Sequence, residues 1–216
     1  MQNLSNPADF LDRLLEKNGY AVDTEKTKKY VSYIDLLTRW NKAFNLTSIR
    51  DPLDMMTLHI ADSLSIHPYL HGDHIADIGT GAGLPGIPLA IFYPHMQFTL
   101  LDSNHKKTRF VTQAVHELKL PNVAVIHART EEYRPETLFS SVVSRAFASI
   151  QVMLETTEHL IQPDGQFLAM KGNYPTEEIK GIPPRFSLNS VHPLTIHGLD
   201  AARHLVCITQ ESSWQK

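Results

Sequence analysis

DIGTGAGLPG, the stretch from Asp77 to Gly86, decides the fold of this chain of 216 residues. It follows a short apolar run that ends at Ile78, and Pro85 is a residue type that favours the first turn of a helix. Glycines at such a junction let the backbone turn tightly and let a ligand come close to it. The first N–H groups of the helix are available to bind that ligand. The stretch therefore predicts a strand, a ligand-binding loop and a helix, which together form a unit of an open α/β sheet.

Short apolar runs and helical patterns alternate around this unit, which indicates a sheet with helices on both faces. The interval between Ile196 and His204 is too short for a crossover helix, and Gly198-Leu199-Asp200 suggests a turn instead, so we expect an antiparallel hairpin at the edge of the sheet. A seven-stranded sheet of this kind is typical of the Rossmann-like methyltransferases. The expected strands are 75–78, 97–102, 123–127, 139–144, 165–170, 186–196 and 204–210, and the expected helices are 85–93, 105–119, 149–161 and 175–180.

The N-terminal third of the chain has a helical pattern instead. Its apolar residues recur at a spacing of three or four. Either Asp23 or Thr24 can cap the second helix, and Pro52 begins a third, broken one. We expect a helical N-terminal extension, residues 1–72, packed on a methyltransferase-like core of residues 73–216.

The composition is that of a globular enzyme, with 42% hydrophobic and 20% charged residues. No apolar run approaches the roughly 18 residues of a membrane-spanning helix, and the first six residues show no secretory signal. The single cysteine, Cys207, excludes an internal disulfide and is typical of a reducing cytosol. We therefore expect a cytoplasmic protein with no membrane contact. The net charge of −3 does not favour nucleic acid as a partner, although a local basic patch could still bind it.

Two classes of ligand match the glycine loop. Gly81 to Gly86 matches the G-x-G-x-x-G pattern of dinucleotide-binding proteins, whereas D-x-G-x-G-x-G from Asp77 is similar to motif I of S-adenosylmethionine enzymes. A carboxylate at Asp77 suits the cationic methionine end of S-adenosylmethionine and would repel a pyrophosphate. Asp102, at the end of the next strand, is placed to hold ribose hydroxyls in either class. We therefore predict S-adenosylmethionine as the cofactor, with contacts from Asp77, Gly79, Gly81 and Asp102.

Several segments together resemble one bacterial family, the small-subunit ribosomal RNA guanine-N7 methyltransferase G, formerly called glucose-inhibited division protein B. The resemblance covers nearly the whole chain in the expected order. It is carried by the segments 40–48 (WNKAFNLTS), 59–63 (HIADS), 77–88 (DIGTGAGLPGIP), 144–148 (SRAFA) and 170–172 (MKG).

The resemblance implies S-adenosylmethionine-dependent methylation of N7 of one guanosine in 16S ribosomal RNA. The partner would be the small ribosomal subunit or its assembly intermediate. The resemblance also implies cofactor contacts from Gly79, Leu84, Thr130, Glu131 and Arg145. For Thr130 and Glu131 the alternative interpretation is a helix cap on a solvated turn.

Guanine N7 carries an in-plane lone pair and no proton, so we predict in-line methyl transfer without a general base, promoted by positioning. The guanine becomes positively charged during transfer, and cations close to its ring are then unfavourable. We therefore expect Arg129, Arg145 and Lys171 to bind a phosphate or O6 and to hold the target base. An ordinary surface ion pair is the alternative for Arg129. Cys207 lies in an apolar run and is predicted to be a buried structural thiol, not a nucleophile.

Other candidate residues favour structural interpretations. Trp40 and Phe44 have helical spacing, which favours packing in the core over stacking against RNA bases. His67 and His71 have the spacing of a metal pair on a helix, but Pro68 interrupts that helix and no further ligand joins them, so no metal is predicted. The role of His59 stays open.

Three alternatives remain beside the ribosomal RNA methyltransferase. A small-molecule methyltransferase would act on metabolites and not on ribosomal subunits. A non-catalytic RNA-binding or nucleotide-binding module would bind the cofactor without turnover. An NAD oxidoreductase is the weakest alternative, because Asp77 opposes it and no Tyr-x-x-x-Lys set is present.

Overall fold

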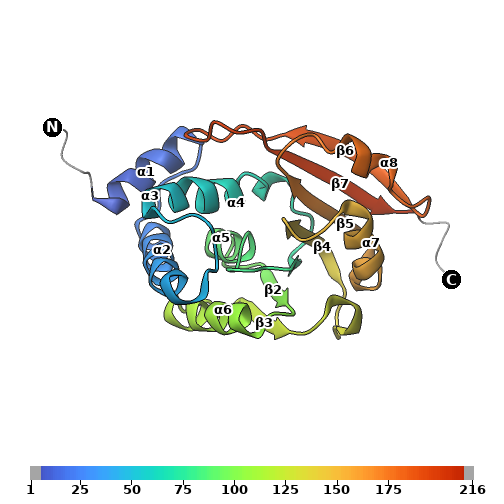
Figure 1. Ribbon diagram of the computed structural model, residues 1–216, viewed down its shortest axis with the longest axis horizontal. Coiled ribbons are helices and arrows are strands. Elements are labelled where there is room, and N and C mark those ends of the chain that lie inside the picture. Colours follow the sequence, from blue (N-terminus) through green and yellow to red (C-terminus); the bar gives the residue numbers. More distant parts are fainter. Residues whose placement is uncertain (1–5, 212–216) are drawn as a thin grey trace.

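The computed structural model describes residues 6–211, and within them seven strands form one sheet of order β3-β2-β1-β4-β5-β7-β6 (Figure 1). Strands β1 to β5 run parallel, and β7 is antiparallel to both of its neighbours, β5 and β6. This confirms the predicted seven-stranded α/β fold with a terminal hairpin. The strands are β1 (His74–Ile78), β2 (Gln97–Asp102), β3 (Val123–His127), β4 (Phe139–Arg145), β5 (Ile161–Lys171), β6 (Phe186–Pro193) and β7 (His204–Gln210). The first five residues, part of the segment in which no secretory signal was expected, lie outside the described residues.

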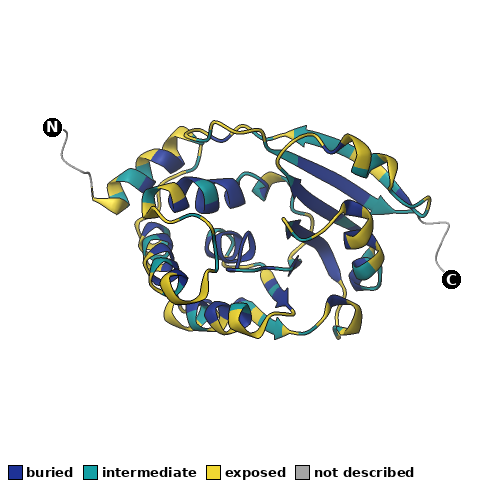
Figure 2. Cartoon of the chain, viewed as in Figure 1, coloured by how far each residue is buried: buried dark blue, intermediate teal, exposed yellow. Residues whose placement is uncertain are grey.

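Helices cover both faces of the sheet, as predicted. Successive strand residues point to opposite faces, so Leu100 lies in one buried cluster with the N-terminal helices and Leu101 lies in the other with α7. Figure 2 shows that the central strands are mostly buried and that the helices are buried on their inner sides, whereas the edge strands β3 and β6 are more exposed. These helices are α5 (Gly86–Phe92), α6 (His105–Glu117), α7 (Ile150–Thr157) and α8 (Thr176–Lys180), with short 3-10 turns η3 (Thr130–Glu132) and η4 (Glu158–Leu160).

The N-terminal extension is helical and packs against the first part of the sheet (Figure 1). Asp23 caps its long helix by accepting hydrogen bonds from two backbone N–H groups of the first turn. Its elements are α1 (Pro7–Lys17), α2 (Thr24–Phe44), α3 (Pro52–Met55), the π-helical segment η1 (Met56–Ala61), α4 (Asp62–Leu64) and η2 (His67–Tyr69). The π-helical segment accounts for the broken pattern expected after Pro52. The division of the chain at residue 72 stays a prediction.

Two tyrosines of α2 fix the extension to the glycine loop and to the helix after it. The Tyr33 hydroxyl donates to the carbonyl of Ala82 at 2.6 Å, and the Tyr30 hydroxyl donates to that of Pro88 at 3.2 Å. Both side chains are buried, and burial raises the pKa of each phenol well above its usual value, so both remain neutral donors. The extension therefore supports the loop directly.

Three local expectations were wrong. The helix expected to run to 161 ends at Thr157, and Ile161 already belongs to β5, because it pairs with Phe139 before a register shift in the ladder. The strand expected to reach 196 ends at Pro193. Phe44 is 40% exposed, although Trp40 packs against the buried Phe110 as expected. Phe44 lies in the last turn of α2, beyond the surface that faces the sheet.

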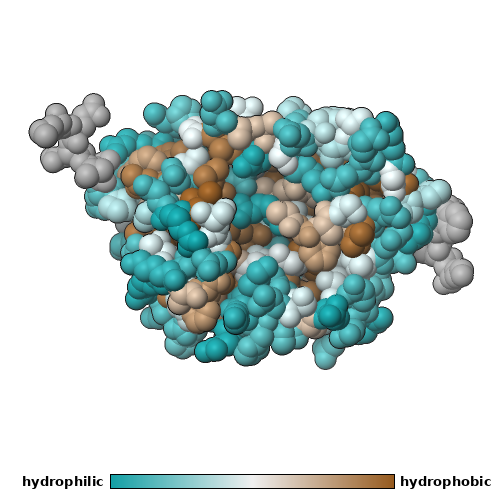
Figure 3. Space-filling model, viewed as in Figure 1, coloured by the Kyte–Doolittle hydropathy of each residue, from teal (hydrophilic) through white to brown (hydrophobic). Residues whose placement is uncertain are grey.

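The surface mixes hydrophilic and hydrophobic residues, and Figure 3 shows hydrophobic residues between hydrophilic ones near the middle of one face. Within residues 6–211, no helix is both long enough and apolar enough to cross a membrane.

Cys207 is buried, with 7% of its surface exposed, as predicted for a structural thiol.

Candidate functional site

The loop between β1 and α5 has the backbone conformation that its glycines allow. Gly79 has a φ of +66°, in the left-handed region that residues with a Cβ atom rarely adopt. Its N–H donates to the carbonyl of Leu101 at 2.8 Å, which fixes the loop to β2. A Cβ atom at Gly79 would lie only 2.3 Å from the ring of Phe147. Both the backbone conformation and the contact with Phe147 therefore require glycine here.

Asp77 lies beneath this loop and organises it. The side chain is completely buried, and its Oδ2 accepts hydrogen bonds from the Thr80 hydroxyl at 2.6 Å and the Gly86 N–H at 2.8 Å. Burial raises the pKa of this carboxyl to about 6, although the two hydrogen bonds act in the opposite direction. The other oxygen, Oδ1, is also buried and has no hydrogen-bond partner among the residues described.

Asp102 at the end of β2 forms part of the wall of a cavity of about 290 Å³. Its Oδ2 accepts from the N–H of Gly81 at 2.9 Å, and its Oδ1 accepts from the N–H of Asn104 at 2.8 Å. Lys107 contributes a cation 3.7 Å from the same carboxylate. The cavity is lined by Gly79, Leu101, Asp102, Ser103, Lys107, Arg129, Thr130, Glu131, Ala146 and Phe147.

This first cavity brings together five of the residues that the sequence singled out: Gly79, Asp102, Arg129, Thr130 and Glu131. Gly81 is fixed to its wall through Asp102. Leu84 is buried behind the loop and is not among the residues that line the cavity, and its contact with the cofactor stays a prediction.

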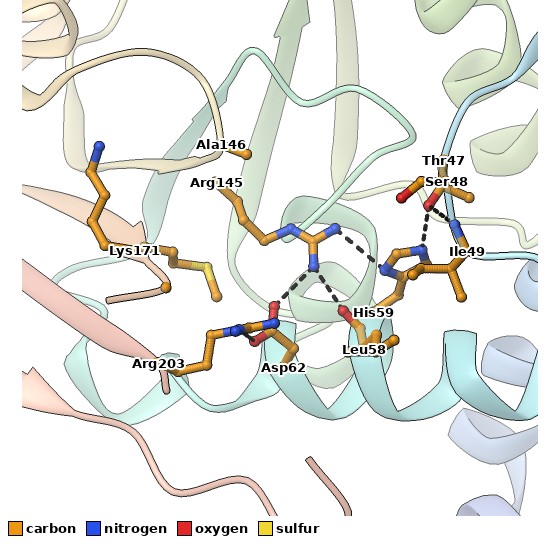
Figure 4. A pocket seen from close by; sticks show the side chains of 12 residues that line it. Thr47, Ser48, Ile49, Leu58, His59, Asp62, Arg145, Ala146, Lys171 and Arg203 are labelled. Carbon is orange, nitrogen blue, oxygen red and sulfur yellow. Dashed lines mark hydrogen bonds and ion pairs between the residues drawn. The ribbon is translucent and has the colours of Figure 1, made fainter. Parts of the chain in front are cut away.

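A second cavity, of about 570 Å³, is drawn in Figure 4. It adjoins the first, because Ala146 lines both. The N-terminal extension supplies half of its wall, and the ends of β4, β5 and the β6–β7 connection supply the rest. The site therefore lies between the extension and the sheet. The lining residues are Thr47, Ser48, Ile49, Leu58, His59, Asp62, Arg145, Ala146, Met170, Lys171, Gly172 and Arg203.

The three cations expected to position RNA are distributed over both cavities. Arg145 faces the second cavity, where its Nη1 donates to the carbonyl of Leu58 at 3.0 Å and to Asp62 Oδ2 at 2.9 Å. Lys171 lies on another part of the same wall, and its ammonium donates to Glu178 at 2.8 Å. Arg129 is exposed and lines the first cavity. Arg145 thus lies in the cavity that Lys171 also lines, and its charge acts on the buried Asp77, where it opposes the rise in pKa. Its contact with the cofactor stays a prediction.

The sequence did not identify Asp62 or Arg203 as site residues. Arg203 donates from Nε to Asp62 Oδ1 at 2.8 Å, across the second cavity's wall. Asp62 belongs to the HIADS segment, which marked a family resemblance but indicated no role. Arg203 lies in no motif, and only the course of the β6–β7 connection brings it to the site.

His59, whose role was open, is a neutral part of the second cavity. It is 5% exposed, and its Nε2 lies 3.0 Å from the Thr47 hydroxyl. Burial, assisted by the nearby Arg145 guanidinium, lowers the pKa of His59 to about 4. The imidazole is therefore uncharged at neutral pH and adds no positive charge to the site.

The depressed pKa of His59 predicts a loss of stability in acid. The unfolded chain takes up a proton near the ordinary pKa of 6.5, whereas the folded chain resists it until about pH 4. The free energy of unfolding should therefore fall as the pH decreases between these values, by about 1.4 kcal/mol per unit at most. In urea titrations, His59→Gln should lose about 2 kcal/mol less than the wild type between pH 6.5 and 5.

A matched control is His116→Gln, because His116 is exposed on α6. That variant should keep the pH dependence of the wild type. Parallel stability curves for His59→Gln and the wild type would refute the assignment of a neutral buried imidazole.

The histidines considered for a metal make other contacts. The His67 ring lies 2.8 Å from the Tyr93 hydroxyl and packs edge-on against Tyr20. In the described part of the chain, no group of three or more His, Cys, Asp or Glu side chains is placed to hold a metal ion.

Solved structures with the same fold define the class of this protein. A coclaurine N-methyltransferase bound to N-methylheliamine and S-adenosylhomocysteine superposes with a TM-score of 0.58 at 10% identity, covering 94% of this chain and 93% of that one. A glycopeptide N-methyltransferase complexed with sinefungin gives a TM-score of 0.62 at 9% identity, covering 71% and 87%. The fold is therefore that of the Rossmann-like methyltransferases.

Sequence similarity identifies the family. Residues 26–206 match the model described as rRNA small subunit methyltransferase G. A ribosomal RNA small subunit methyltransferase G of Idiomarina loihiensis is 46% identical over 202 residues, 94% of this chain and 98% of that protein. One from Salmonella paratyphi B is 48% identical over 198 residues, 92% and 96%. The chain belongs to the rRNA small subunit methyltransferase G family.

Proposed function

We propose that this protein transfers a methyl group from S-adenosylmethionine to N7 of one guanosine in 16S ribosomal RNA, in the cytoplasm. The substrate would be the small ribosomal subunit or its assembly intermediate. The observation that carries the proposal is the pair of adjoining cavities that share Ala146. One cavity has the acid and glycines suited to a nucleoside, and the other has cations suited to RNA.

The first cavity suits the cofactor in three respects. Asp102 offers carboxylate oxygens at the wall, where ribose hydroxyls would be held. The Oδ1 atom of Asp77 is a buried acceptor with no partner among residues 6–211, which favours a cationic ligand nearby. Gly79 leaves the backbone accessible, and Thr130 and Glu131 lie where an adenine edge would be held. When bound, S-adenosylmethionine supplies the activated methyl group.

The second cavity suits a nucleotide whose reacting atom needs no proton removed. His59 is neutral and engaged with Thr47, so it is not placed as a general base. Arg145 and Arg203 give the wall positive charge for a phosphate or a carbonyl oxygen. Catalysis would come from holding guanine N7 in line with the methyl group, near Ala146, which lines both cavities.

The direct test uses small subunits from a strain that lacks this methylation. Incubation with labelled S-adenosylmethionine should place N7-methylguanosine at a single position of 16S ribosomal RNA, detected by chemical cleavage. Asp102→Ala protein serves as the control and should leave the RNA unlabelled. Label on small molecules alone would support the small-molecule methyltransferase instead. Cofactor binding without any turnover would support the non-catalytic binding module.

A further inference from the structure

Asp62 connects two arginines that come from distant parts of the chain. It begins α4, directly after the π-helical segment η1, a type of helix that often marks functional sites. Its side chain is 2% exposed. One carboxylate oxygen accepts from Arg145 at 2.9 Å and the other accepts from Arg203 at 2.8 Å (Figure 4). Both oxygens are thus used, one for each guanidinium.

The charges of this group do not cancel. Two guanidiniums face one carboxylate, which leaves a net charge of about +1 on a wall of low solvent exposure. The neighbouring His59 is neutral. Lys171, the other cation of the cavity, is paired with Glu178, and its side chain points away from Asp62 (Figure 4). The excess charge therefore belongs to the arginine pair, and an anion would balance it.

Each guanidinium keeps unused donors. Arg203 uses Nε for Asp62 and Nη1 for the carbonyl of Ala202, while its Nη2 has no partner among residues 6–211. Arg145 uses Nη1 twice, and its Nη2 makes only a contact of 3.5 Å with His59. A guanidinium held on one edge by a carboxylate presents its other edge in a fixed direction, which suits oxygen atoms of a phosphate.

We propose that Asp62 is a positioning residue, which holds the Arg145 and Arg203 guanidiniums as a pair for a phosphate of the RNA next to the target guanosine. This rests on the function proposed above. A phosphate is favoured over guanine O6 because the ring gains positive charge during transfer, whereas the phosphate stays negative throughout. Without Asp62, both cations would remain in the cavity but would lose their fixed directions.

Methylation kinetics on unmodified small subunits test this role. In Asp62→Asn, one amide oxygen cannot serve two guanidiniums, so kcat should fall by about tenfold or more while the KM for subunits changes little. Both guanidinium charges remain and one negative charge is removed, so the slope of log KM against log salt should not decrease. Arg203→Gln should instead raise KM and reduce the slope of log KM against log salt by about one, because one phosphate contact is lost.

A matched control is Arg185→Gln. Arg185 also donates from Nε to a carboxylate, Glu158 at 2.6 Å, but it lines neither cavity. This variant should keep the kcat, the KM and the salt slope of the wild type. Arg203→Lys keeps the positive charge but loses the planar guanidinium with its fixed donors. Its kcat should therefore fall as in Asp62→Asn, while its slope of log KM against log salt stays unchanged.

Asp62→Asn must also be tested for folding, by its thermal unfolding midpoint, which is expected to match that of the wild type. Its affinity for S-adenosylhomocysteine separates an effect through the predicted cofactor contact of Arg145 from an effect on the RNA, and an unchanged affinity is the result expected for the RNA. If Asp62→Asn does not fold, the proposal is tested with Arg203→Gln and Arg203→Lys, because the Arg203 side chain is partly exposed and its replacement is less disruptive. An unchanged kcat in folded Asp62→Asn would overturn the proposal. An unchanged slope of log KM against log salt in Arg203→Gln would show that the arginine pair does not bind a phosphate and would favour guanine O6 as its ligand. Absence of methylation by the wild type would instead refute the proposed function.

Discussion

Replacing Asp102 by alanine is expected to weaken the binding of S-adenosylhomocysteine by about a hundredfold. Two contributions add up. The carboxylate would no longer accept ribose hydroxyls, and hydrogen bonds to a charged group contribute about 1.5–3 kcal/mol each. The N–H of Gly81 would also lose its acceptor at 2.9 Å, which frees the glycine loop. A loss of about 3 kcal/mol corresponds to roughly a hundredfold in Kd. Isothermal titration calorimetry measures it directly.

Asp164→Ala provides the matched control, because Asp164 is an exposed carboxylate in β5 outside both cavities. Its affinity for the same ligand should equal that of the wild type. An Asp102→Ala protein that binds within about threefold of the wild type would show that the first cavity does not hold the nucleoside through this acid.

The second large effect is expected from Gly86→Ala, at the start of α5. The added Cβ would lie 2.7 Å from Asp77 Oδ2 and within 2.8–2.9 Å of two atoms of Leu100. Both neighbours are completely buried, and Asp77 is held by hydrogen bonds from Thr80 and Gly86. Overpacking of this kind costs about 1–3 kcal/mol, and displacing Asp77 from the Gly86 N–H adds to it. We expect the free energy of unfolding to fall by about 3 kcal/mol, measured by urea denaturation.

Gly181→Ala is the control for this prediction. A Cβ at Gly181 would meet its nearest atom, the carbonyl oxygen of Glu178, at 3.5 Å, an ordinary contact. That variant should unfold within about 0.5 kcal/mol of the wild type. A Gly86→Ala protein of wild-type stability would mean that the space under the loop is less restricted than the buried contacts indicate.

Much of the first cavity could be predicted from the sequence because its residues are local to strand ends. Parallel strands end at one edge of the sheet, so Asp77 and Asp102, each at or near the end of a neighbouring strand, had to come close to the same loop. Thr130 follows β3 at the same edge. The sequence did not show that Asp77 is also the buried acceptor for Thr80 and Gly86 beneath the loop.

The second cavity could not be predicted in this way. Its wall combines side chains more than a hundred residues apart, such as Asp62 and Arg203, and no spacing rule relates an N-terminal helix to a hairpin connection. The family resemblance implied a role for Arg145, but it could not show that Asp62 and the Leu58 carbonyl hold its side chain. The direction of a long flexible side chain depends on partners that only the packed chain supplies.

The sequence alone therefore determined the glycine loop, the order of strands and helices and the residues at the strand ends. Each of these follows from backbone preferences and from hydrophobic periodicity, which act over a few residues. The tertiary structure alone decided how the loop is supported by Asp77 from below and by Tyr33 from the extension. It also decided that Asp62 joins two arginines, because burial and long-range hydrogen bonds depend on the whole packed chain.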